Sequence, residues 1–360
     1  MKSRFSAKEK SPNNNDIESS VKTGVLLTNL GSPSAPTAGA VRKYLSEFLS
    51  DPRVVEIPRL IWLIILHGII LRIRPKKSAL LYKSVWTEKG APLIVISQDQ
   101  KEKVAAKLKD KYGQSVMVEL AMRYGEPSIP SVLQKFQAQG VNNIVILPLY
   151  PQYASPTTAS TFDAISNELK KWRYIPNLTF INSYHNNADY ITALANSITE
   201  HLNTFGKPDK LVFSYHGMPE LFYEWGDPYY DFCKITTDLV KEELLNRSNN
   251  GLISKDVSLL SEDFVMTFQS RFGKAEWLKP YTDATLEELA KAGNKHIAIL
   301  SPAFSADCLE TLEELECENR EVFMEAGGEE YHYISALNDR DDHIKAIYNI
   351  LVTKLNSIQH

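Results

Sequence analysis

Residues 23–33 (TGVLLTNLGSP) and residues 209–219 (DKLVFSYHGMP) follow the same pattern and decide the fold. Each stretch is a run of apolar residues that leads into a loop in which a Gly and a Pro are separated by one residue. A second pair, residues 142–154 (NNIVILPLYPQYA) and 294–306 (NKHIAILSPAFSA), follows in the same order. Two strand-to-loop units that recur in one order predict two similar domains, each built around its own sheet.

The apolar runs also indicate how the strands pair. Strands are expected at residues 25–30, 144–149, 211–215, 264–268 and 297–300. Their apolar residues are continuous rather than alternating, which is typical of a parallel sheet with helices on both faces. The predicted fold class is therefore α/β, with two doubly wound domains. Ligands are expected at the carboxyl ends of the strands, in the crevice between the domains.

The length of the chain allows two domains, because 360 residues exceed the roughly 100 to 200 expected for one. We expect a disordered N-terminal tail at residues 1–22, a first domain at 23–193 and a second domain at 194–340. The polar segment at 246–263 (NRSNNGLISKDVSLLSED) is expected to be a surface loop.

The composition excludes several classes of protein. A formal net charge of -4 and a pI near 6.1 argue against a nucleic-acid partner, which would require an excess of Lys and Arg. The three cysteines, Cys233, Cys308 and Cys317, can form neither a disulfide framework nor a four-cysteine zinc site. The polar N-terminus lacks the apolar core of a signal peptide, so the chain is expected to be cytoplasmic.

Residues 60–71 (LIWLIILHGIIL), here called the apolar lip, form the most hydrophobic segment. The run is shorter than the roughly 18 residues of a membrane span, so it is not expected to cross a bilayer. One interpretation is a buried core helix. The other is a surface that lies against a membrane or a flat apolar ligand, which the basic flanks Arg59, Arg72 and Arg74 favour.

His216 has the context of a catalytic residue. It ends the predicted strand at 211–215 and is followed by Gly217, so the imidazole is expected at the edge of the sheet where such folds bind ligands. A histidine at the end of a strand can equally be a hydrogen-bonded structural residue, and the local sequence leaves both roles open.

Three glutamates, Glu310, Glu314 and Glu318, recur every four residues after the last predicted strand. On an α-helix this spacing puts the three carboxylates on one stripe. The stripe is either a solvated acidic face or a row of oxygen ligands along which a divalent cation such as Fe²⁺ passes. The helix begins at the same edge of the sheet as His216, which favours the second interpretation.

Aromatic and polar residues form weaker signals. Trp277 lies among polar neighbours in residues 267–283 (TFQSRFGKAEWLKPYTD), so it is either a core residue or a flat face for a planar ligand. The sequence contains no P-loop, no G-x-S-x-G, no H-E-x-x-H and no G-x-G-x-x-G motif. Nucleotide chemistry and triad hydrolysis therefore lack their usual residues.

Five motifs in order resemble the ferrochelatase family: LLTNLGSP, LYPQYASPTT, SYHGMP, TFQSRFGKAEWLKPYTD and SPAFSADCLETLEEL. The resemblance extends from about Gly24 to about Leu337. It implies two Rossmann-like, chelatase-type domains with a porphyrin cleft between them, and a C-terminal helix at 341–358 that packs back on the first domain.

The resemblance also implies the site residues. His216 and Glu310 match the catalytic His and Glu, and together with Glu314 and Glu318 they match the metal path. The positions that match the porphyrin-binding residues of the family are Leu30, Tyr82, Arg123, Tyr124, Gln152 and Trp277. The apolar lip matches the segment at the mouth of the cleft.

The implied activity is a lyase-class ferrochelatase that inserts Fe²⁺ into protoporphyrin IX with release of two protons, the terminal step of haem biosynthesis. No cofactor beyond the substrate Fe²⁺ is expected, because three cysteines cannot supply the four ligands of the [2Fe-2S] cluster that some relatives bind. A chelatase for another metal or for coproporphyrin, and a non-catalytic porphyrin or haem carrier, are the alternatives. Peripheral membrane contact through the apolar lip is a further expectation.

Overall fold

The computed structural model of the chain describes residues 5–6, 22–254, 257–271, 273 and 275–358. The chain divides into two compact units. Unit 1 comprises Met1–Tyr150, Ser155–Ser183 and Ile347–His360, and unit 2 comprises Pro151–Ala154 and Tyr184–Ala346.

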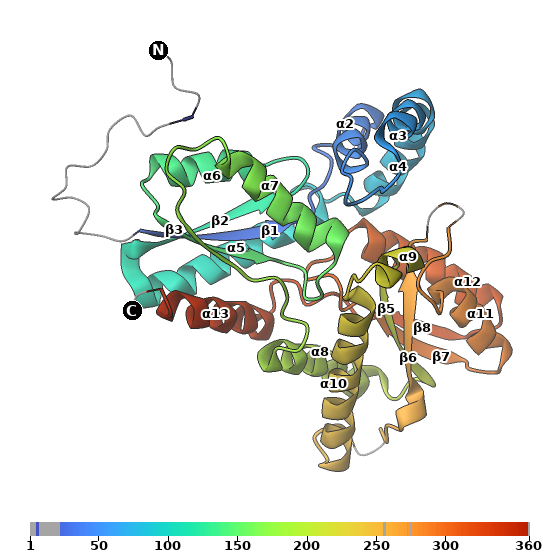
Figure 1. Cartoon of the computed structure of the whole chain (residues 1–360). Helices are drawn as coiled ribbons and strands as arrows, with labels where there is room; N and C mark the ends of the chain where they lie inside the picture. Colours follow the sequence, from blue (N-terminus) through green and yellow to red (C-terminus); the bar gives the residue numbers. More distant parts are fainter. Residues whose placement is uncertain (1–4, 7–21, 255–256, 272, 274, 359–360) are drawn as a thin grey trace. The chain divides into compact units, whose positions relative to one another are not determined.

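Unit 1 contains a parallel sheet of four strands in the order β2-β1-β3-β4. The strands are β1 (Thr23–Asn29), β2 (Val116–Met122), β3 (Asn143–Pro148) and β4 (Asn177–Phe180). The central strands β1 and β3 are buried along their whole length, as the continuous apolar runs predicted. Figure 1 shows α6 (Ile129–Ala138) and α7 (Ser160–Leu169) on one face and α5 (Pro92–Tyr112) on the other.

The apolar lip belongs to an arm of unit 1 that precedes α5. The arm consists of α2 (Ala38–Phe48), α3 (Arg59–Ile65), the π-helical turn η1 (Leu66–Ile70) and α4 (Leu71–Val85). One face of the lip is buried against α2, with Trp62 donating a hydrogen bond to the Leu49 carbonyl (2.6 Å). The opposite face exposes Leu60 (81%), Ile64 (74%) and Ile61 (56%). The lip is therefore no buried core helix, and among the described helices none is long and apolar enough to cross a membrane.

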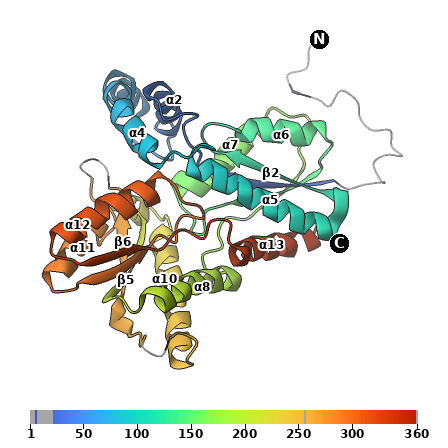
Figure 2. The ribbon, with the colours of Figure 1, turned by 180° about the vertical axis from the view of Figure 1, so that it is seen from behind.

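Unit 2 repeats the plan of unit 1. Its parallel sheet has the order β6-β5-β7-β8, formed by β5 (Lys210–His216), β6 (Phe264–Gln269), β7 (His296–Leu300) and β8 (Glu330–Tyr333). Figure 2 shows α11 (Thr282–Lys291) and α12 (Asn319–Glu325) on one face and α8 (Ala188–Phe205) and α10 (Tyr229–Asn249) on the other. In both sheets the first strand along the chain lies second in spatial order. The two sequence echoes therefore reflect equivalent strands, β1 with β5 and β3 with β7.

The remaining elements of the described chain are η2 (Gly113–Ser115), η3 (Ser155–Ala159), α9 (Glu220–Glu224), η4 (Ser261–Asp263), η5 (Glu310–Glu318) and α13 (Asp341–Asn356). The helix α13 crosses the boundary between the units, which lies after Ala346. Its C-terminal end is tied within unit 1, where the Tyr112 hydroxyl donates to the Asn356 side chain (2.7 Å).

Several expectations need correction. The sequence did not predict β2, β4 and β8, because β4 and β8 are only four residues long and half-exposed, and β2 is half-exposed over its first four residues. The boundary between the units lies at 183/184 instead of 193/194. The reason is that α8 packs within unit 2, where the Tyr190 hydroxyl donates to the Pro302 carbonyl (2.7 Å).

The predicted loop at 246–263 is also only partly a loop. Its first residues continue α10 to Asn249, and its last residues form η4. Between them Ile253, Val257 and Leu259 are buried, so the apolar residues of this segment anchor it to unit 2. The predicted disordered tail at 1–22 lies mostly outside the described residues. Of the described ones, Ser6 pairs with the backbone beside Trp172.

Candidate active site

His216 is the last residue of β5, a central strand of the unit 2 sheet. The following Gly217 is required by packing, since a Cβ there would lie 2.5 Å from the Gln269 carbonyl oxygen. The absent side chain lets the Gly217 N–H donate to that same oxygen (2.7 Å). Gly217 thus holds the end of β5 against the end of β6 and fixes the position of the imidazole.

One hydrogen bond determines the tautomer of His216. Its Nδ1 lies 2.6 Å from the Gly217 carbonyl oxygen, which can only accept. Nδ1 therefore carries the proton in the neutral ring, and Nε2 keeps its lone pair. An imidazole in this state can accept a proton or bind a metal ion through Nε2.

Trp277 lies next to this histidine loop. The backbone of Trp277 bridges to Pro219, and the Leu278 N–H donates to the Met218 carbonyl (2.9 Å). The indole is half-buried and its Cε3 would lie 3.1 Å from a Cβ at Gly217. Trp277 and His216 therefore belong to two loops that contact each other.

The acidic segment is a π-helix rather than the predicted α-helix. Residues Glu310–Glu318 form η5, in which hydrogen bonds span five residues instead of four. Spacing alone cannot reveal this difference, because carboxylates at i and i+4 are neighbours in either helix type. Thr311 and Leu315 form the buried side of η5.

Glu314 is fixed by the residues that follow β6. Its carboxylate accepts hydrogen bonds from the Ser270 N–H (2.6 Å), the Ser270 hydroxyl and the Gln269 side-chain amide (3.4 Å). Burial raises the pKa of Glu314, and the neighbouring Glu310 carboxylate raises it too, while the Ser270 hydrogen bonds and the charge of His216 act in the opposite direction. The net effect is a raised pKa.

The structure therefore places two predicted residues, His216 and Glu310, close enough to a third, Glu314, to affect its pKa. Glu310 is half-buried, and its carbonyl oxygen accepts a hydrogen bond from the Gln269 amide (2.7 Å). Glu318 lies at the other end of η5 and is exposed. The three carboxylates thus lie along one segment, from the exposed Glu318 to the half-buried Glu314 and Glu310.

Gln269 and Ser270 were not predicted as site residues. Gln269 is buried beside His216 in the sheet register and bonds to η5 through its amide. Ser270 has a φ of 64°, a conformation that is uncommon for residues other than Gly and tends to occur at functional sites. The only sequence signal for both was their position directly after a strand, in the motif that contains Trp277.

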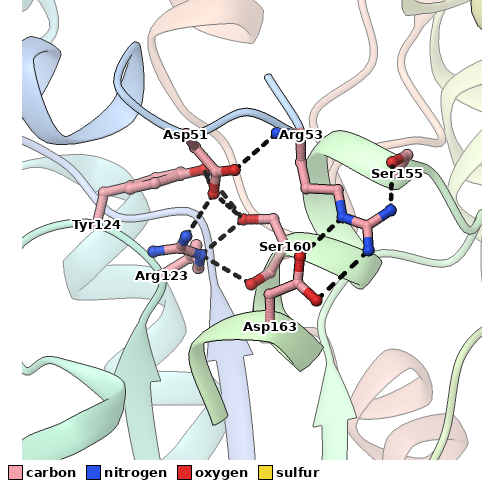
Figure 3. Close-up of polar contacts among 7 residues, drawn as sticks. All are labelled: Asp51, Arg53, Arg123, Tyr124, Ser155, Ser160 and Asp163. Carbon is pink, nitrogen blue, oxygen red and sulfur yellow. Dashed lines mark hydrogen bonds and ion pairs between the residues drawn. The ribbon is translucent and has the colours of Figure 1, made fainter. Parts of the chain in front are cut away.

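Arg123 and Tyr124 of unit 1 belong to a buried polar network (Figure 3). The Asp51 carboxylate pairs with the Arg123 guanidinium and accepts from the Tyr124 hydroxyl (2.9 Å) and the Ser160 hydroxyl (2.6 Å). Burial alone raises the pKa of Asp51, but the hydrogen bonds and the Arg123 charge outweigh it, so the pKa is lowered. Tyr124 is fully buried, whereas Arg123 also borders an open hollow of about 970 Å³ within unit 1.

The remaining predicted porphyrin-binding residues have different surroundings. Leu30 and Tyr82 are half-buried in unit 1, where both pack against the core of the arm that carries the apolar lip. Gln152 is buried in unit 2, and its side-chain amide donates to the Thr236 hydroxyl (3.0 Å). Contact of these residues with a porphyrin stays a prediction.

Comparison with known proteins identifies the family. The family model described as Ferrochelatase matches residues 22–355. The chain belongs to the ferrochelatase family. It is 60% identical over 336 residues to the ferrochelatase of Shewanella denitrificans, an alignment that covers 92% of this chain and 97% of that protein. It is 59% identical over 330 residues to ferrochelatase 2 of Shewanella oneidensis, with the same coverage.

Solved structures of other chelatases share the fold of this ferrochelatase-family chain. SirB from Bacillus subtilis with Fe³⁺ superposes with a TM-score of 0.53 at 12% identity, covering 94% of this chain and 98% of that one. The family match confirms the predicted metal-chelatase class, and the two parallel sheets confirm the predicted α/β fold.

Proposed function

We propose that this chain inserts Fe²⁺ into protoporphyrin IX to form protohaem, with release of two protons. The observation that carries the proposal is the tautomer of His216, which leaves the Nε2 lone pair as the acceptor, together with the nearby carboxylates Glu310 and Glu314. Metal insertion needs both a proton acceptor and a path for the ion, because two pyrrole N–H groups must lose protons as the metal enters. This group of side chains can supply both.

His216 is assigned the role of proton acceptor. Imidazole is the side chain that most often serves as a general base in proteins. The Nδ1 hydrogen bond to Gly217 stabilises the tautomer in which Nε2 accepts the proton.

The carboxylates are assigned to the ion. Oxygen ligands suit Fe²⁺ while leaving it exchangeable, which a transfer path requires. Glu318 at the exposed end of η5 receives the ion, Glu314 passes it on and Glu310 delivers it. The raised pKa of Glu314 favours release, since a carboxylate that is easily protonated holds a cation less tightly.

Trp277 is assigned to the macrocycle, and the same role stays a prediction for the other predicted porphyrin-binding residues. A planar porphyrin directs its N–H groups inward, so the lone pairs of its nitrogens are poorly accessible. Binding energy from the periphery of the ring can support a bent geometry that exposes them. The half-exposed indole beside His216 provides a flat face for this purpose.

Anaerobic absorption spectroscopy with protoporphyrin IX and Fe²⁺ tests the proposal. We expect the wild-type chain to convert the porphyrin spectrum to that of haem, and His216→Ala to lose turnover by at least about 100-fold while still quenching porphyrin fluorescence on binding. His332→Gln is the matched control, since this imidazole lies on the face of the sheet opposite to Tyr331, the β8 residue that bonds to η5. Normal turnover by His216→Ala would remove this residue from the mechanism.

The same assay separates the alternatives. A porphyrin or haem carrier would bind protoporphyrin without any change of spectrum on addition of Fe²⁺. A chelatase with another preference would turn over faster with Co²⁺ or Zn²⁺, or with coproporphyrin, under matched conditions. Either outcome would replace the proposed substrate pair.

We also propose peripheral membrane contact and a cytoplasmic location. The exposed apolar side chains of the lip, flanked by Arg59, Arg72 and Arg74, support a surface that inserts shallowly among lipid headgroups. The absence of a [2Fe-2S] cluster stays a prediction, and it is consistent with Cys233 and Cys308 being buried in unit 2 and Cys317 being exposed.

A further inference from the structure

A second group of potential metal ligands lies in unit 2, apart from η5. It consists of His296, the first residue of β7, with Glu330 and His332 of β8. One ligand atom from each residue lies within 4.8 Å of the other two. The His296 Nδ1 is 3.4 Å from a Glu330 carboxylate oxygen.

The strand register produces this grouping. His296 pairs with Glu330, and Ala298 pairs with His332. Because side chains alternate along a strand, these three ligands share one face of the sheet, while Ile297, Ile299 and Tyr331 pack into the core on the other face. Residues 296 and 332 are 36 positions apart in the chain and become neighbours only through this pairing.

A third imidazole approaches from the helix that covers this face. His201 of α8 has its ring centroid 5.3 Å from that of His332. The His296 ring is equally close to His332, with a centroid separation of 5.1 Å, so the three imidazoles are grouped around His332.

Two ring nitrogens of this cluster lack hydrogen-bond partners. The Nε2 atoms of His201 and His296 are buried, and neither bonds to any of the residues that the structure describes. A buried polar nitrogen without a partner costs free energy, and such groups are few in native proteins. A bound cation is one partner that would satisfy a neutral imidazole nitrogen.

The cluster is remote from the proposed active site. In the sheet, Lys210 of β5 is level with Ile297 of β7, so His296 is level with the start of β5. His216 ends β5 six residues after Lys210, a separation of about 20 Å at the usual rise of a strand. An ion at the amino ends of the strands cannot contact ligands at their carboxyl ends.

We propose that His296, Glu330 and His332, supported by His201, form a second metal site that takes a borderline divalent transition metal such as Zn²⁺. Imidazole nitrogens with one carboxylate suit Zn²⁺, whereas Ca²⁺ and Mg²⁺ require oxygen ligands. The ligand atoms must approach by about 1 Å to reach Zn–N distances near 2.0 Å. The exposed Glu330 side chain can rotate to close the site. The bound ion ties the short edge strand β8 to β7 and α8.

Isothermal titration of the untagged full chain with Zn²⁺ tests this inference. In a His216→Ala, Glu314→Gln background, which removes ligands of the proposed active site, we expect about one equivalent of Zn²⁺ to remain bound. Adding His332→Gln should weaken this binding at least about tenfold, and Glu330→Gln, a change at an exposed side chain, should weaken it also. His67→Gln, an exposed histidine of η1, serves as the control and should leave binding unchanged.

Two results would overturn the inference: equal Zn²⁺ affinity with and without His332→Gln, or loss of all Zn²⁺ binding in the background variant alone. Metal insertion by His332→Gln with otherwise native residues should equal that of the wild type, which also verifies that this variant folds. A failure of the proposed chelatase function would change the activity assay but not the titration, so the two proposals are tested separately.

Discussion

Ser270→Gly tests how the site controls the charge of Glu314. The Ser270 hydroxyl donates to the Glu314 carboxylate, and the left-handed backbone of Ser270 (φ 64°) is one that glycine adopts without strain. The substitution therefore removes one hydrogen bond while the N–H bond from residue 270 remains. Because the lost bond stabilised the charged form, we expect the pKa of Glu314 to rise further.

The size of the effect follows from the strength of such a bond. A hydrogen bond to a charged group contributes about 1.5 to 3 kcal/mol, and 1.36 kcal/mol corresponds to one pH unit. We take the lower end because Glu314 is half-buried and keeps its other two hydrogen bonds. The acidic limb of the pH profile for metal insertion should therefore move up by about one pH unit, a loss of about tenfold below the limb.

The assay measures the anaerobic rate of Fe²⁺ insertion by the wild type and by Ser270→Gly between about pH 5.5 and 9, a range in which both proteins are expected to remain folded. Ser270→Asn, which tolerates the left-handed backbone and keeps a donor, is the matched control and should shift the limb less. An acidic limb that stays in place or moves to lower pH would refute the assignment of Glu314 as a residue that must be ionised.

Three further predictions concern stability and membrane contact. Asp51→Asn removes the buried carboxylate that pairs with the Arg123 guanidinium (16% exposed). The free energy of unfolding in urea should therefore fall by about 2 to 3 kcal/mol, and a decrease under about 0.5 kcal/mol would contradict this expectation. Burial lowers the pKa of His343 from 6.5 to about 4, so between these pH values only the unfolded chain binds the extra proton. The free energy of unfolding should therefore fall by up to about 3 kcal/mol as the pH drops through this window. His343→Asn should reduce this dependence of stability on pH, and an unchanged dependence would argue against the role of His343. Replacing Leu60 and Ile64 by Ser should reduce the amount of protein that sediments with anionic vesicles by at least about tenfold. The rate of Fe²⁺ insertion into detergent-solubilised porphyrin should not change. Equal sedimentation of the variant and the wild type would exclude the apolar lip as the membrane surface.

Several features of the fold could be predicted because they are encoded locally. Continuous apolar runs mark the central strands β1, β3, β5 and β7, since a strand buried on both faces needs apolar side chains at every position. The short edge strands β4 and β8 escaped prediction because half-exposed strands carry no such run.

The candidate active site was also predicted only in part from the sequence. The prediction that His216 and the acidic segment lie at one edge of the unit 2 sheet needed only the rule that parallel strands end together. The contacts that hold Glu314 join it to Ser270, 44 positions away in the chain, and only the tertiary structure brings these residues together. Gln269 and Ser270 were missed because nothing in their own sequence distinguishes them from other polar residues at the ends of strands.

By itself, the sequence determined that the chain contains two repeats of a parallel sheet, and it placed a histidine and three glutamates after strands of the second repeat. Only the tertiary structure decided that the glutamates lie on a π-helix and that His296, Glu330 and His332 meet at the opposite edge. The physical reason is that the hydrophobicity of each residue indicates whether its side chain is buried. Which side chains become neighbours depends instead on pairing between distant strands and on the hydrogen-bond pattern of a helix, and neither leaves a local pattern in the chain.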